Sequence, residues 1–377
     1  MKDLPRKPAD SHVQALYRGC LLGGAVGDAL GAPVEFMSSA EIAKTFGAGG
    51  IQEYVPAYGR LGAITDDTQM TLFTAEGVLR AYIRQNLRGI CHPPTVIAFA
   101  YQRWLHSQGR THALQEGRVD GWLIGHKELY SRRGPGSTCL SGLGAMKDGG
   151  DLANNDSKGC GGVMRVAPVG MAFATLARPS RSGRAQLRRD AFELGCTSAA
   201  ITHGHPTGQL ASGAFAVIVM QLLLGVTLPK AISGVLSLLA SQPKNDETTT
   251  AIQLAVRLAK ARPGDSHTLA ELGGGWIAEE ALAISLYCAL SAKDFRSGVT
   301  LAVNHSGDSD STGSMAGQLL GAMYGVDRIP DSWLTQLELR GVIEEIADDL
   351  AVFTDWRLND DEAVEEEDFY FQRYPGA

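Results

Sequence analysis

Apolar residues recur at spacings of three and four along most of this chain, and that spacing limits its fold more than any other feature. Leu72, Ala75, Leu79 and Tyr82 form one such row. Residues at these spacings share one face of an α-helix, whereas a half-buried strand shows strict alternation. The sequence has no convincing alternating ladder and no fixed-period repeat. We therefore predict one all-α body.

The same spacing assigns most of the chain to helices, joined by two long glycine-rich connections at 37–63 and 131–165. Because long loops inside a compact domain are usually functional, we expect a loop-lined cleft at one end of the helical body. Residues 1–12 are interpreted as a flexible arm, 13–354 as the helical domain and 355–377 as an acidic tail. Helices are predicted from about residue 13 and over 95–107, 113–130, 166–177, 190–202, 207–225, 229–240, 248–262, 277–291, 294–304, 315–325 and 331–353.

Composition narrows the classes of function. The chain has 377 residues, 44% hydrophobic and 20% charged, with a net charge of −7, which is typical of a globular protein and argues against nucleic acid as the main partner. Six scattered cysteines without a C-x-x-C pair favour neither a zinc site nor a disulfide framework, and they suit a reducing cytoplasm. The polar N-terminus lacks the apolar core of a signal peptide. The longest apolar run, Ala214–Leu224, predicts a buried helix and no membrane partner.

Two acidic clusters stand at predicted helix starts. Asp308 and Asp310 lie among hydroxyl and amide side chains, just before the apolar run from Met315. Far upstream, Asp66 and Asp67 follow Thr65, a plausible N-cap. Ordinary capping and the helix dipole explain acids at such places, so a purely structural interpretation stays open. The alternative is a metal site, because hard divalent cations take oxygen ligands.

The kind of metal site can be narrowed further. The start of the second cluster matches the first half of a calcium-binding EF-hand loop, but the twelfth position, which needs a bidentate Glu, is Leu319. Two Mg²⁺ ions would instead nearly balance five buried carboxylates, with Glu35 as the fifth and with Thr65 and Ser311 as neutral oxygens. Nothing in the sequence itself brings residues 66 and 308 together.

Two further segments are candidates for ligand contact. The glycine-rich stretch 154–165 leads into an apolar helix, so its backbone N–H groups suit a phosphate or another anion, although a plain flexible connection has the same composition. His203 and His205 are too few for a transition-metal site, and a ligand hydrogen bond is the better interpretation.

Five segments, taken together, resemble the ADP-ribosylglycohydrolase family, which includes the dinitrogenase reductase-activating glycohydrolase. They occur in the family's order over roughly residues 13 to 325: GGAVGDALGAPVE (23–35), TDDT (65–68), GCGGVMRVAP (159–168), THGH (202–205) and GDSDSTGSMAGQLLG (307–321). Each segment alone is weak, whereas five in order are specific.

The resemblance implies an all-α fold, a single large orthogonal helical bundle, with a dinuclear metal cleft that holds two Mg²⁺ or sometimes Mn²⁺. It implies the catalytic residues Asp67, Glu35 and Asp310. The implied metal ligands are Thr65, Asp66, Asp67, Asp308, Asp310 and Ser311, where many relatives have Thr at the last position. The implied substrate-binding residues are Asp28, Gly159, Cys160, Gly161, Gly162 and His203.

The activity implied by the resemblance is removal of ADP-ribose from a modified protein side chain. We favour the N-glycosidic bond of ADP-ribosyl-arginine, with O-linked serine or acetyl ester as the alternative linkage. A second alternative is an immunity protein that binds and neutralises an ADP-ribosylating toxin, with the arm and the acidic tail as contact surfaces.

Overall fold

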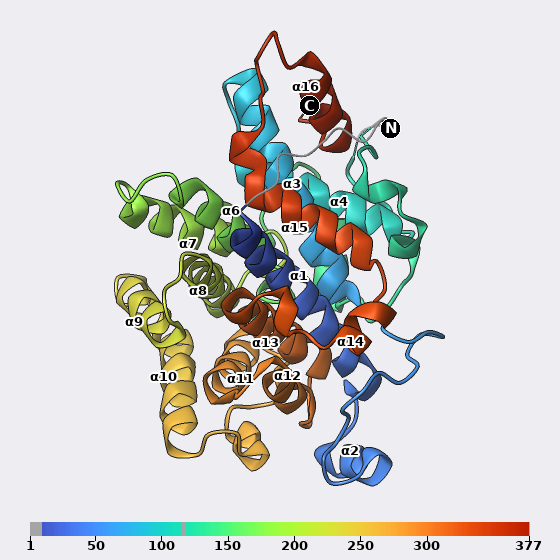
Figure 1. The fold of residues 1–377 in the computed structure, drawn as a ribbon, viewed down its shortest axis with the longest axis vertical. Coiled ribbons are helices and arrows are strands. Elements are labelled where there is room, and N and C mark those ends of the chain that lie inside the picture. The colour runs from blue at the N-terminus through green and yellow to red at the C-terminus, as the bar shows by residue number, and fades with distance from the viewer. Residues whose placement is uncertain (1–9, 115–117, 377) are drawn as a thin grey trace.

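The structure is a computed structural model that describes residues 10–114 and 118–376. Within these residues the chain is helical and has no named strand, only the isolated bridges Ala57–Arg60 and Gly159–Ile277, so the all-α prediction is confirmed (Figure 1). The α-helices are α1 Ser11–Gly31, α2 Ser39–Phe46, α3 Asp66–Arg88, α4 Pro93–Ser107, α5 Ser137–Ala145, α6 Ala167–Ala177, α7 Arg184–Ala200, α8 Pro206–Leu223, α9 Leu228–Leu239, α10 Asp246–Ala261, α11 Ala278–Ser291, α12 Phe295–Val303, α13 Ser309–Tyr324, α14 Asp331–Gln336, α15 Arg340–Val352 and α16 Val364–Arg373.

Helices α1 and α13 lie side by side at the centre of the molecule and run antiparallel (Figure 1). Glycines at every fourth position make their backbones touch: a Cβ on Gly23 would lie 2.4 Å from the carbonyl oxygen of Gly317, and one on Gly27 only 1.9 Å from that of Gly313. The last turn of α1 therefore lies against the first turn of α13. This contact joins the motif that ends at Glu35 to the one that begins at Asp308.

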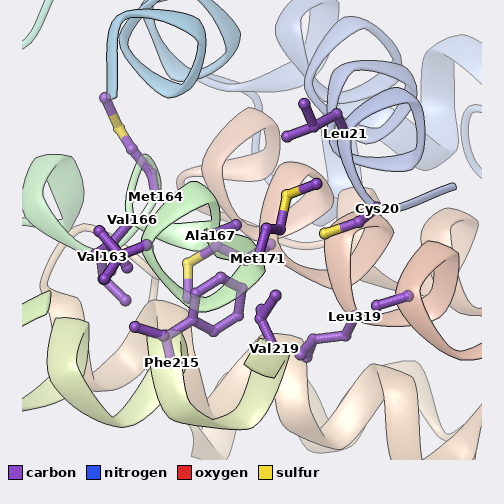
Figure 2. Close-up of a cluster of buried hydrophobic side chains, with 14 of the residues drawn as sticks. Cys20, Leu21, Val163, Met164, Val166, Ala167, Met171, Phe215, Val219 and Leu319 are labelled. Atoms are coloured by element: carbon purple, nitrogen blue, oxygen red, sulfur yellow. The ribbon is translucent and has the colours of Figure 1, made fainter. Parts of the chain in front are cut away.

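The core lies against this helix pair and continues to the acidic end of α13. Figure 2 shows side chains from four helices converging, with Cys20 on α1, Met171 on α6, Val219 on α8 and Leu319 on α13, all of them buried. In helix α8, which contains all but the last residue of the longest apolar run, 89% of the residues are buried, as predicted for a core helix. Met164, just before α6, is also buried and reaches Ser311, with its sulfur 3.8 Å from the hydroxyl.

Several local predictions were wrong. The helix expected over 113–130 is absent from the described part of that range, which contains the short 3₁₀ turns Leu123–Gly125 and Lys127–Tyr130. The two connections interpreted as loops contain the short helices α2 and α5. The single helix expected over 331–353 is broken between α14 and α15, where Leu339 takes a left-handed conformation with φ of 55°.

The chain ends also differ from expectation. Most of the predicted arm lies outside the described residues, but Ser11 and His12 belong to α1, with Asp10 as the N-cap. In the acidic C-terminal segment the acids are mostly exposed, whereas Tyr370 and Tyr374 are buried and stack on Trp356. The segment therefore packs on the helical body and is not simply a solvated strip.

Candidate active site

The first turn of α3 presents the upstream acids as the sequence indicated. Thr65 is the N-cap, and its hydroxyl accepts a hydrogen bond from the Asp67 N–H (3.3 Å). Asp66 and Asp67 occupy the first turn and are 4% and 2% exposed. Asp66 also accepts a hydrogen bond from the backbone N–H of Gly136 (3.1 Å), which ties the start of α3 to the loop before α5.

The first turn of α13 presents the second pair of acids. Asp308 is at the N-cap position, and Asp310 and Ser311 follow in the first turn. The Asp308 N–H donates to the carbonyl oxygen of Gly274 (2.8 Å). Gly307, with φ of 150°, allows this approach, because a Cβ there would lie 1.9 Å from the same oxygen. This backbone hydrogen bond fixes the position of Asp308 and therefore where α13 begins.

The structure brings both clusters and Glu35 together. Glu35 follows the turn Ala32–Val34 after α1, and carboxylate oxygens of Glu35, Asp308 and Asp310 all lie within 4.8 Å of one another. The Ser311 hydroxyl donates to Asp67 Oδ2 (3.2 Å), joining residues 244 positions apart. We call Glu35, Asp66, Asp67, Asp308 and Asp310 the acidic cluster.

Burial and mutual repulsion make the charged forms of these acids unfavourable. Burial, and then the charges of Asp308, Asp66 and Asp28, raise the pKa of Glu35 to about 8. Burial also raises the pKa of Asp66 to about 8, although the Gly136 hydrogen bond opposes it. The pKa values of Asp67 and Asp310 lie well above the ordinary range for the same reasons, and that of Asp308 is raised, chiefly by burial.

The acidic cluster fits divalent cations. Glu35 Oε2 and Asp67 Oδ1 are buried without a hydrogen-bond partner, a costly state for carboxylate oxygens in the folded protein. No lysine, arginine or histidine forms an ion pair with any of the five acids among the described residues. A hard cation with oxygen ligands would satisfy these atoms and balance their charge.

Asp28, predicted to bind substrate, holds the start of α3 through its carboxylate. It is fully buried, and its carboxylate accepts hydrogen bonds from Thr65 N–H (3.0 Å), Thr68 N–H (3.1 Å) and the Thr68 hydroxyl (2.5 Å). Burial raises its pKa to about 6, against the effect of these bonds. These hydrogen bonds show that Asp28 positions the start of α3, and its role in substrate binding stays a prediction.

The glycine-rich loop lies against the second acidic pair. The thiol of Cys160 donates to Asp308 Oδ2 (2.8 Å), and Cys160 Sγ is 3.7 Å from the Ser311 hydroxyl. Gly159 and Gly161 pack on the His203 ring, where added Cβ atoms would lie 3.4 and 3.1 Å from it. Gly162 is buried against Ala199.

His203 is almost fully buried, which limits the contact expected of it. It is 1% exposed, its Nδ1 pairs with the Thr202 hydroxyl (2.8 Å), and burial lowers its pKa to about 3. The ring is therefore neutral at physiological pH. In the structure the His203 ring packs against Gly159 and Gly161 and so supports the glycine-rich loop.

Several residues beside the acidic cluster were not singled out from the sequence. Tyr58 has an unusual left-handed φ of 51°, and a Cβ on Gly134 would lie 3.4 Å from its hydroxyl and 3.6 Å from Asp66 Oδ1. Phe36 and Trp276 stack on each other close to Glu35 and Asp308. The Gly-Pro-Gly sequence at 134–136 indicated a turn, but the aromatic positions have no local signal, because their partners are distant in sequence.

Comparisons with known proteins agree with this arrangement. The family model described as ADP-ribosylglycohydrolase matches residues 9–360. The ADP-ribosyl-[dinitrogen reductase] glycohydrolase of Rhodospirillum rubrum is 30% identical over 336 residues, covering 87% of this chain and 92% of the relative. The ADP-ribosylarginine hydrolase Tri1 of Pseudomonas putida is 26% identical over 349 residues, covering 89% and 78%.

Two more similarities are more distant. The ADP-ribosylhydrolase ARH3 of Mus musculus is 23% identical, with 85% of this chain and 87% of the relative covered. A solved structure described as an ADP-ribosylglycohydrolase-related protein complex superposes with a TM-score of 0.61 at 26% identity, covering 90% of this chain and 98% of that one.

Proposed function

The chain belongs to the ADP-ribosylglycohydrolase family, and from this membership we propose that it removes ADP-ribose from arginine side chains of modified proteins in a metal-dependent reaction. The observation that carries the metal dependence is the convergence of Glu35, Asp308 and Asp310 within 4.8 Å, with Asp67 held beside them by Ser311. The arginine linkage is supported by a relative named as an ADP-ribosylarginine hydrolase. The relative named ADP-ribosylhydrolase ARH3 carries no linkage in its name, so the O-linked alternative stays open.

The donor set defines the proposed cofactor. Thr65, Asp66, Asp67, Asp308, Asp310 and Ser311 would hold two Mg²⁺ ions, or Mn²⁺, with Glu35 close by. When bound, such cations supply positive charge that orients substrate hydroxyls and lowers the pKa of water. They would also lower the pKa values of the surrounding acids, which burial raises in the metal-free protein.

The protein's own groups then have distinct roles. In the hydrolysis, water adds through its oxygen to C1″ of the ribose as the bond to the arginine nitrogen breaks. Glu35 or Asp67 accepts the proton of the water, because each has a buried oxygen without a hydrogen-bond partner, and that proton then passes to the departing arginine nitrogen. Asp310 stabilises the positive charge that develops on the ribose. The loop Gly159–Gly162 receives the ribose and the pyrophosphate through the N–H groups of Gly161 and Gly162, since those of Gly159 and Cys160 already donate to Ser157 and Trp276.

Asp310→Ala tests the proposal directly. We expect turnover of arginine-linked ADP-ribosyl protein to fall by at least about a hundredfold, since a carboxylate beside the reacting centre is lost. The circular dichroism spectrum should stay unchanged. Full activity in this variant, or in protein stripped of metal by a chelator, would rule out the metal-dependent mechanism. A substrate carrying serine-linked ADP-ribose, assayed in parallel, decides the linkage.

Two further expectations are a toxin partner and a cytoplasmic location. The relatives with functional names are described as hydrolases, and nothing in those names or in the described contacts supports a toxin partner. All six cysteines are free, which supports the proposed cytoplasmic location.

A further inference from the structure

Phe36 and Trp276, which we call the aromatic pair, expose large apolar side chains beside the acidic cluster. Phe36 is 79% exposed and Trp276 is 44% exposed. Their ring centroids lie 5.8 Å apart and their planes differ by 19°, so they form an offset stack. Two large exposed rings stacked on each other form an apolar patch, and exposed apolar patches mark binding surfaces more often than single exposed residues do.

The backbone places both rings at the acidic cluster. Phe36 directly follows Glu35. Trp276 follows Gly274 and Gly275, which contact Asp308: Gly274 accepts the Asp308 N–H, and a Cβ on Gly275 would lie 3.4 Å from Asp308 Cβ. The carbonyl of Trp276 also accepts the Cys160 N–H (3.1 Å). The backbone segments that carry the aromatic pair therefore adjoin the acidic cluster at Glu35 and Asp308.

Aromatic faces beside clustered carboxylates are suited to an organic cation. Guanidinium groups stack on aromatic rings, and the acids add long-range attraction. The same chemistry occurs inside this molecule, where the Arg165 guanidinium lies 4.2 Å from the Tyr101 ring centroid and that of Arg296 lies 4.5 Å from Trp333. The exposed face of Phe36 has no such partner within the described residues.

We propose that the exposed face of Phe36, supported by Trp276, binds the guanidinium of the ADP-ribosylated arginine and so selects arginine over neutral acceptors such as serine. This assignment rests on the proposed function and adds the residues that set its specificity. A neutral serine ether would gain no cation–π contact here, whereas the guanidinium keeps its charge.

Replacement of the ring by an aliphatic side chain of similar size tests the proposal. Phe36→Leu should lower kcat/KM for arginine-linked ADP-ribosyl protein about fivefold, as expected for one cation–π contact. Phe36→Tyr, which keeps an aromatic face, should stay within about twofold of wild type. The dissociation constant for free ADP-ribose, measured by calorimetry with Mg²⁺ present, should be the same in all three proteins. Tyr324→Leu is the matched control, because Tyr324 is a partly exposed aromatic residue at the opposite end of α13.

The alternative ligand for the aromatic pair is the adenine ring of ADP-ribose. Weaker ADP-ribose binding by Phe36→Leu, in proportion to its loss of kcat/KM, would assign the pair to adenine and overturn the proposal. Unchanged kcat/KM in Phe36→Leu would overturn it as well, while leaving the proposed function intact. Wild-type protein that releases no ADP-ribose from arginine would refute the proposed function and this assignment together.

Discussion

The acidic side chains at this site are of two kinds. Some have carboxylate oxygens without a hydrogen-bond partner, and others use their oxygens to hold neighbouring groups in place. Asp28 is the clearest of the second kind, since its carboxylate accepts three backbone or hydroxyl hydrogen bonds at the start of α3. Sequence resemblance cannot separate the two kinds, because both are acids in the same motifs. Burial and hydrogen-bond partners separate them: Glu35 and Asp67 have unpartnered oxygens, and Asp28 does not.

Asp28→Asn should weaken metal binding through the position of α3. The amide offers one acceptor where the carboxylate offers two, so a buried N–H or hydroxyl of Thr65 or Thr68 loses its partner, at a cost of about 1–3 kcal/mol. We expect a lower free energy of unfolding in metal-free protein and a higher dissociation constant for Mg²⁺. Urea unfolding and calorimetry measure the two effects. Asp331→Asn, at an exposed position on α14, is the control, and equal behaviour of the two variants would contradict the supporting role of Asp28.

At the level of helices, local signals explain what could be predicted. Thr65 followed by two acids marks the start of α3, and the structure begins that helix at Asp66. For α13 the apolar run predicted a helix only over 315–325, whereas the structure begins it at Ser309. In contrast, α2 and α5 are short, and the break at Leu339 falls on a residue that rarely takes a left-handed conformation. At the break, tertiary contacts override the local preference for a helix. The carboxylate of Glu338, the residue before Leu339, pairs with Arg133.

The meeting of Glu35 with Asp308 could not be derived from either motif alone. Its physical cause is the glycine spacing in both helices, since Gly19, Gly23 and Gly27 face Gly321, Gly317 and Gly313 in turn. Glycines at this spacing let two helices approach closely, but the sequence does not identify the partner helix.

Gly317→Ala should destabilise the protein strongly for a one-carbon change. Its Cβ would lie 2.0 Å from the Gly23 carbonyl oxygen, so the helices must move apart, and such overpacking costs roughly 1–3 kcal/mol or more. Gly341→Ala on α15 is the matched control, because nothing lies within 4 Å of a Cβ there and alanine favours a helix. Thermal unfolding should separate the two variants by several degrees in opposite directions. Equal unfolding temperatures would show that the helix pair tolerates separation.

At the scale of the whole molecule, we expect the acidic cluster to make the stability of the folded protein depend on pH and on bound metal. Glu35 and Asp66 have pKa values of about 8 in the metal-free folded protein, against about 4 in an unfolded chain. The folded state thus binds these protons more tightly. Their contribution to stability is complete below about pH 4 and is lost as pH rises through about 8.

Metal-free protein should therefore unfold at a lower temperature at pH 8.5 than at pH 6. Mg²⁺ should reverse the trend, because ionised carboxylates bind the cation and binding to the folded state alone raises the unfolding temperature. Differential scanning calorimetry with a chelator and with Mg²⁺ at both pH values measures this. A chelated protein that is more stable at pH 8.5 would contradict the assigned proton affinities.

The contact between α1 and α13 also has a consequence for how the protein is made. One helix comes early in the chain and its partner comes late, so during synthesis α1 leaves the ribosome on the order of tens of seconds before α13 exists. Throughout that interval a glycine- and alanine-rich apolar surface has no native cover. Nascent chains halted before residue 309 should bind chaperones, and the hydrolase cannot assemble its acidic cluster until translation is nearly complete.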